Sequence, residues 1–71
     1  MKKPAAKRTI VACMKATSQL NEALLQIKKS AGKDEFAYYK KHIGRILGDI
    51  LVDVMRPVLA EYPELEPDAW K

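Results

Sequence analysis

Apolar residues recur at three- and four-residue intervals through the second half of the chain, from Asp34 to Tyr62. This spacing is typical of an amphipathic helix, because residues three and four apart lie on the same side of an α-helix. Asp34 is a suitable N-cap and Glu35 favours the positive end of the helix dipole, so we predict a helix over residues 34–62. Its apolar residues are Phe36, Tyr39, Ile43, Ile46, Leu47, Ile50, Leu51, Val54, Met55, Val58 and Leu59.

A narrower apolar stripe runs through residues 9–31 and predicts a second helix there. The stripe contains alanines and no aromatic residue, so a partner helix can approach closely and must supply the bulk of the core. Gly32 suits a left-handed C-cap, and only a short link follows it, which predicts an antiparallel hairpin. The stripe comprises Cys13, Ala16, Thr17, Leu20, Ala23, Leu24, Ile27 and Ala31.

The apolar arc of the helix predicted over residues 34–62 is wider than one short partner helix can cover. This excess predicts association, because a contiguous apolar surface of that size is uncommon on a monomer. We therefore expect an all-α fold in which two antiparallel hairpins dimerise into a four-helix bundle. The residues expected at helix-packing or dimer interfaces are Ala16, Leu20, Ala23, Leu24, Ile27, Phe36, Ile43, Gly44, Leu47, Gly48, Ile50, Leu51, Val54, Met55 and Val58.

Gly44 and Gly48 interrupt the same predicted helix one turn apart. Each glycine costs about 1 kcal/mol relative to alanine inside a helix, which calls for a compensating contact. Close approach of a neighbouring helix would compensate, and either the small residues Ala16 and Ala23 or a second copy of the same helix would fit. A ligand or partner that needs the space is the alternative.

Prolines lie before and inside the predicted hairpin. Residues 1–8 are rich in bases and contain Pro4, so we expect a flexible arm before a helical hairpin over residues 9–62. Pro57 lies inside the apolar pattern, where its missing N–H and its ring predict a kink in the second helix.

Pro63 ends the second predicted helix, and residues 63–71 follow as an acidic, proline-containing tail. Two interpretations of this tail remain open. Leu65 and Trp70 either attach it to a face of the bundle or touch little, as in a frayed terminus.

A chain of 71 residues forms one domain with a small core, and folds of this size usually need an additional stabilising link. The sole cysteine, Cys13, excludes an internal disulfide, and with His42 as the only histidine a structural zinc site is not expected. Oligomerisation is the link that remains. No secretory signal follows Lys2 and Lys3, and we expect a cytoplasmic protein that does not span a membrane.

Charge is distributed unevenly. Residues 1–33 carry eight bases and one acid, whereas residues 34–71 carry five bases and eight acids. We interpret this asymmetry as alignment between the two helices or between subunits, since the bases are spread along the first helix. The alternative is a nucleic-acid-associated protein that binds phosphate through the N-terminal arm and the first helix, with Lys2, Lys3, Lys7 and Arg8 as the contacting residues.

Catalytic patterns are not apparent. A polar sector of the second predicted helix holds the nearest candidates, but no carboxylate lies one turn from His42, and no second histidine is present to complete a metal site. Cys13 lies on the apolar stripe without a neighbouring base, so we expect an unreactive thiol. We therefore expect no catalytic residue, metal or cofactor, and a homodimeric interaction or scaffold protein for which another protein is a further candidate partner. The sector comprises Tyr38, His42, Arg45, Asp49, Asp53 and Arg56.

Overall fold

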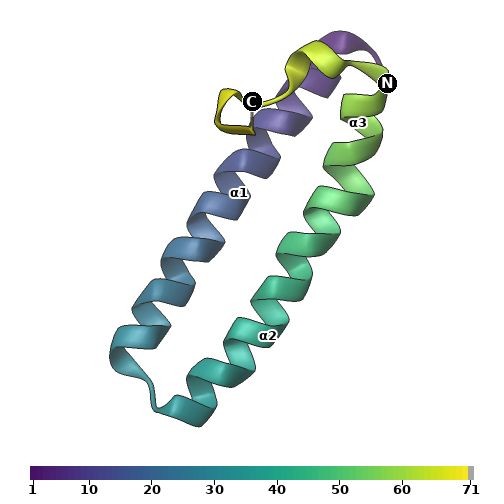
Figure 1. Cartoon of the computed structure of the whole chain (residues 1–71). Helices are drawn as coiled ribbons and strands as arrows, with labels where there is room; N and C mark the ends of the chain where they lie inside the picture. The colour runs from purple at the N-terminus through teal and green to yellow at the C-terminus, as the bar shows by residue number, and fades with distance from the viewer. Residues whose placement is uncertain (71) are drawn as a thin grey trace.

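The structure is a computed structural model that describes residues 1–70. Two long helical arms run antiparallel, and the chain returns to the end where it began (Figure 1). Residues 1–70 contain helices and turns and no strand, which confirms the predicted all-α hairpin. The elements are α1 (Lys3–Ser30), α2 (Lys33–Asp49), a π-helical segment η1 (Ile50–Met55), α3 (Arg56–Glu61) and two 3₁₀ turns, η2 (Pro63–Leu65) and η3 (Asp68–Trp70).

The N-terminal residues are helical, so the prediction of a flexible arm over residues 1–8 is wrong. Helix α1 begins at Lys3, with Pro4 in its first turn, where the missing N–H of proline leaves no hydrogen bond unmade. Ala6 has no exposed surface, and the Tyr62 hydroxyl donates a hydrogen bond of 2.9 Å to the carbonyl of Met1. Contacts with the C-terminal part of the chain therefore fix the N-terminal residues, although their many bases predict a solvent-exposed arm.

The link between the two arms differs in detail from the prediction. Gly32 has φ −69° and is the N-cap of α2, so it does not adopt the left-handed C-cap conformation expected for it. Ala31 caps α1 instead, through its N–H to the carbonyl of Ile27. Asp34 lies in the first turn of α2 and is not the N-cap, although it still complements the helix dipole there.

Pro57 is accommodated by a widened helical turn directly before it. Proline removes an N–H donor, and its ring clashes with the carbonyl four residues earlier in a regular α-helix, which here belongs to Asp53. Through η1 the pattern widens, so that the N–H of Arg56 bonds to the carbonyl of Leu51, five residues back. The predicted interruption near Pro57 thus takes the form of a π-helical segment within a continuous helical arm.

The tail folds back onto the first helix. After Tyr62 the chain turns twice, in η2 and η3, and lies over the N-terminal half of α1 (Figure 1). Leu65 packs against the core, while Trp70 stays 41% exposed. The tail is therefore attached through its leucine; Lys71 lies outside the described residues.

The core is small and lies at the end of the hairpin where both termini meet. Ala6, Ile10, Met55 and Val58 form its buried cluster, with Met55 only 1% exposed. Ile43 is also buried, nearer the connecting turn. Since the hairpin measures 44 × 21 × 17 Å, most of its length is a two-helix contact without a third layer.

Burial separates the residues predicted at interfaces into three groups. Those within the fold of the single chain are Ile43, Met55 and Val58. Those half-buried between the arms are Ala16, Leu20, Leu24, Ile27, Phe36, Leu47, Ile50 and Leu51. Those left exposed are Ala23, Gly44, Gly48 and Val54.

Candidate interaction surface

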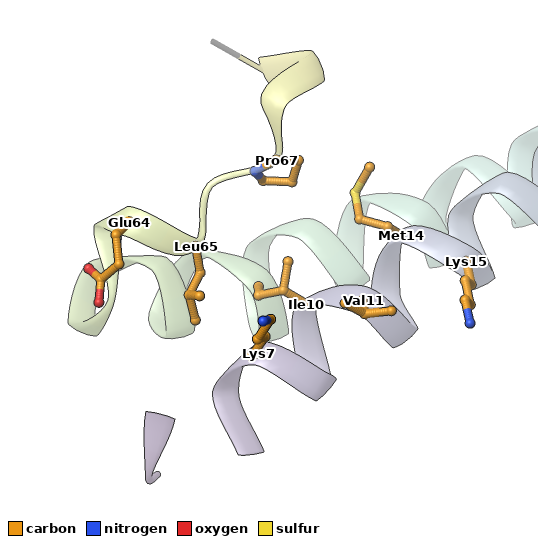
Figure 2. Close-up of a pocket in the computed structure, with 8 residues that line it drawn as sticks. All are labelled: Lys7, Ile10, Val11, Met14, Lys15, Glu64, Leu65 and Pro67. Atoms are coloured by element: carbon orange, nitrogen blue, oxygen red, sulfur yellow. The ribbon is translucent and has the colours of Figure 1, made fainter. Parts of the chain in front are cut away.

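Three hollows follow one another along one face of α1. At its tail end a hollow of about 400 Å³ lies between α1 and the tail (Figure 2). Ile10, Val11 and Met14 line it from α1, and Leu65 and Pro67 line it from the tail, so its floor is apolar. Its charged lining residues are Lys7, Lys15 and Glu64.

The hollows continue past the tail towards the connecting turn. Met14 also lines a second hollow, of about 300 Å³, which reaches Gly48 and Trp70. Leu25 lies eleven residues after Met14, at helical spacing, and lines a third hollow of about 170 Å³ with Phe36. We call the surface formed by these three hollows the α1–α2 groove.

The two helical glycines do not pack against the first helix. A Cβ atom built at Gly44 or Gly48 meets nothing within 4 Å outside its own helix backbone. The suggestion that Ala16 and Ala23 of the same chain approach these glycines closely is therefore wrong. A second copy or another partner remains as the predicted neighbour.

Lysines border the groove. Lys7 and Lys15 line the hollow at the tail end, and Lys28 lines the hollow at the turn end. On α2, Lys40 precedes Gly44 by one turn and is exposed, so it lies on the same side of that helix. Positive charge thus follows the groove along both helices.

Two of the three acidic residues of α2 lie away from the groove, whereas Asp34 is about 80° from Gly44 around the helix. At about 100° per residue, Glu35 is about 180° and Asp49 about 140° from Gly44 around the helix. Glu22 is the single acid of α1 and is exposed. It follows Lys15 by seven residues, so it lies on the same side of α1 as that lysine. The halves of the chain differ in charge as the sequence indicates, and in the folded hairpin Glu35 and Asp49 lie away from the groove.

A second apolar surface lies on the flank of α2 away from the glycines. Tyr39, Ile46 and Val54 follow one another at seven- and eight-residue spacing, which keeps them on one side of the helical arm. They are 41%, 47% and 39% exposed. We call these three residues the tyrosine stripe.

The polar sector of α2 is open to solvent. Tyr38 stacks at a tilt on His42, with ring centroids 4.3 Å apart, and meets Tyr39 edge-on at 5.1 Å. Among residues 1–70 no ion pair joins Arg45 with Asp49 or Asp53 with Arg56, and exposed pairs at such spacing gain little free energy. No cluster of three metal-ligating side chains occurs in the described part of the chain.

The bases predicted to contact phosphate lie along the first turns of α1 and just before it. Lys2, Lys3, Lys7 and Arg8 are all exposed. The Lys3 ammonium pairs with Glu64 at 3.1 Å, whereas Lys7 and Arg8 border a shallow hollow of about 570 Å³. These bases are thus distributed around the start of α1, and one of them, Lys3, forms an ion pair with the tail. Cys13 is half-buried against the core, where the sequence places it.

A polar clasp closes the end of the hairpin. The amino terminus lies 3.8 Å from Glu61, and the Tyr62 hydroxyl donates to the carbonyl of Met1. Partial burial raises the pKa of Tyr62, with further contributions from Glu61 and Glu64. Hydrogen bonding to its own backbone, followed by hydrogen bonding to Lys3, lowers the pKa of Glu64. Sequence reasoning missed this clasp, whose residues lie about sixty positions apart.

Comparison of the chain with protein-family models, with curated proteins and with solved structures finds no match. None of the helices within residues 1–70 has the length and apolar character needed to cross a bilayer. The cytoplasmic location and the absence of enzymatic activity stay predictions.

Proposed function

We propose that the protein is a small helical interaction module that pairs with a second copy of itself through the tyrosine stripe. The observation that carries this proposal is the exposure of Tyr39, Ile46 and Val54 on one side of the second arm. Large apolar side chains gathered on one surface favour association, because burying a fully exposed side chain of this kind gains about 1.5–3 kcal/mol and these three still expose roughly two fifths of their surface.

Charge favours the tyrosine stripe over the α1–α2 groove as the surface for self-pairing. Next to the stripe, α2 carries both signs, with Arg45 and Asp49 exposed one turn apart. A two-fold axis brings identical surfaces together, so a mixed surface can pair each acid with a base of the other copy. Two copies of the lysine-bordered groove would instead place like charges opposite one another.

Such a pair of hairpins is a four-helix bundle, as the width of the apolar arc predicts. The long dimension of 44 Å allows the partner hairpin to lie along most of the arm. Stable interfaces bury roughly 800 Å² per partner, which a contact along several helical turns supplies. The small core of the single chain then gains a second apolar layer.

Sedimentation velocity over a range of concentrations tests the proposed pairing. Ile46→Glu places a charge in the middle of the tyrosine stripe, and we expect the dimer to be lost while the helical circular dichroism is kept. Val11→Glu is the matched control, since Val11 is 46% exposed in the α1–α2 groove and Ile46 is 47% exposed. Two results would refute the pairing. One is a wild-type chain that stays a folded monomer at about 100 μM, and the other is equal dimerisation of the two variants.

A second candidate function is binding of nucleic acid by the start of α1. The observation that favours it is the shallow hollow bordered by Lys7, Arg8 and Lys15, three exposed bases within two helical turns. Phosphate-driven binding weakens steeply with salt, because each neutralised phosphate releases a counterion. Titration of a fluorescent duplex DNA and a single-stranded RNA at about 50 and 200 mM salt decides, and no binding at the lower salt excludes this function.

A further inference from the structure

The tail of the chain carries the chemistry that complements the α1–α2 groove. In its sequence, acids alternate with apolar residues, from Glu64 and Leu65 to Asp68 and Trp70. Glu64 forms an ion pair with Lys3, and Leu65 packs against the buried cluster. One end of the groove is therefore already covered by an acidic, apolar segment of the same chain (Figure 2).

The rest of the groove is open in the single chain. From Met14 to Leu25 it extends over eleven residues of α1, or about 16 Å at 1.5 Å per residue. Its floor there contains Leu47 and Leu51, and Gly48 leaves open space above the helix backbone. This length matches about three turns of a helix lying along the groove.

We propose that the open part of the α1–α2 groove docks an amphipathic helix of a partner protein whose polar side is acidic. Apolar side chains of that helix at three- and four-residue spacing enter the hollows, and its carboxylates face the bordering lysines. The arrangement extends, in a partner, the contact that Leu65 and Glu64 make within the chain.

Charge and shape select this occupant over two others. A second copy would bring its own lysines, such as Lys28 and Lys40, against the same groove. A nucleic-acid strand would satisfy the lysines but leave an apolar floor, which includes Met14 and Leu51, without apolar contacts. An acidic amphipathic helix satisfies both the border and the floor.

A synthetic peptide provides the test, with the full chain and its single tryptophan as the reporter. The probe is a 14-residue helical peptide with leucines at three- and four-residue spacing, glutamates elsewhere and no tryptophan. Trp70 borders the second hollow, so its fluorescence should shift on binding. We expect saturable binding of this peptide that weakens with salt, and no binding of a peptide with lysine in place of glutamate.

Two pairs of variants place the binding on the groove. Gly48→Leu fills open space in the groove and should weaken binding at least tenfold, whereas Ala60→Leu, at an exposed position of α3, should leave it unchanged. Lys40→Glu should weaken binding several-fold, whereas Arg45→Glu, about 140° from Lys40 around α2 and outside the lining of the three hollows, should not. Circular dichroism and urea unfolding establish that each variant keeps its fold.

Four outcomes would overturn the docking proposal. They are no binding of the glutamate peptide, equal binding of the lysine peptide, equal effects of the paired variants, and displacement of the peptide by an oligonucleotide. Ile46→Glu separates this proposal from self-pairing, because a chain that can no longer dimerise should still bind the peptide. If Gly48→Leu abolished dimerisation, the groove would be the self-pairing surface and both assignments of faces would be wrong.

Discussion

Substitution of Gly48 by alanine tests whether the flank of α2 with the two glycines is free in the single chain. Gly48 lies inside α2, and alanine is favoured over glycine there by about 1 kcal/mol. An added Cβ meets nothing within 4 Å, so no steric penalty offsets this gain. We therefore expect Gly48→Ala to raise the free energy of unfolding by about 1 kcal/mol, and Gly44→Ala to do the same.

The assay is urea unfolding followed by circular dichroism, at a chain concentration where sedimentation shows a monomer. If the slope of the unfolding free energy against urea concentration is unchanged and the midpoint is higher, the native state is more stable. Gly32→Ala is the control, because Gly32 is the N-cap of α2, a position where alanine is less favourable than glycine. The same substitution should therefore give no gain at position 32.

A loss of stability in Gly48→Ala would refute this reasoning. It would mean that another part of the chain packs closely on that flank in solution. A gain at low concentration that turns into a loss at high concentration would place the self-pairing surface at the glycines instead of the tyrosine stripe.

Two further predictions concern the core and the clasp. Met55→Ala removes a side chain that is 1% exposed and should lower the free energy of unfolding by about 2–5 kcal/mol, whereas Leu25→Ala, at a half-exposed position, should change it far less in the urea assay. Because the pKa of Glu64 is lowered in the folded state, its contribution to stability is present above the ordinary carboxyl pKa of 4.5 and is lost as pH falls through the lower folded value. Trp70 fluorescence should follow this release of the tail in acid, and the Glu64→Gln variant should lack the acid step; an identical pH profile in that variant would contradict the assignment.

The hairpin could be predicted from the spacing of apolar residues because helix formation and antiparallel pairing depend on local sequence. The bases of residues 2–8 predict a solvent-exposed arm and a first helix from residue 9, whereas α1 begins at Lys3. Ala6 and Ile10 continue the stripe of Cys13 at four- and three-residue steps, so the signal was present. Ala6 is buried although Lys3 and Lys7 nearby are charged and exposed, because their side chains lie on other sides of the helix.

The position of the core and the polar clasp could not be predicted from the spacing of apolar residues. The core depends on where Met55 points after the widened turn of η1, which is set by the clash that Pro57 avoids. The bond between Tyr62 and Met1 joins residues 61 positions apart, and no local pattern encodes it. The position of Lys40 near the glycines, and of Glu35 and Asp49 away from them, follows from helical spacing and could be predicted from the sequence.

The most direct test of the proposed self-pairing is an isotope-filtered nuclear Overhauser experiment on a mixture of ¹³C-labelled and unlabelled full chains. It detects only contacts between copies. We predict intermolecular contacts from the methyl groups of Ile46 and Val54 to the ring of Tyr39, and none to Gly44 or Gly48. Intermolecular contacts confined to the α1–α2 groove, or none in a folded sample at millimolar concentration, would contradict the account.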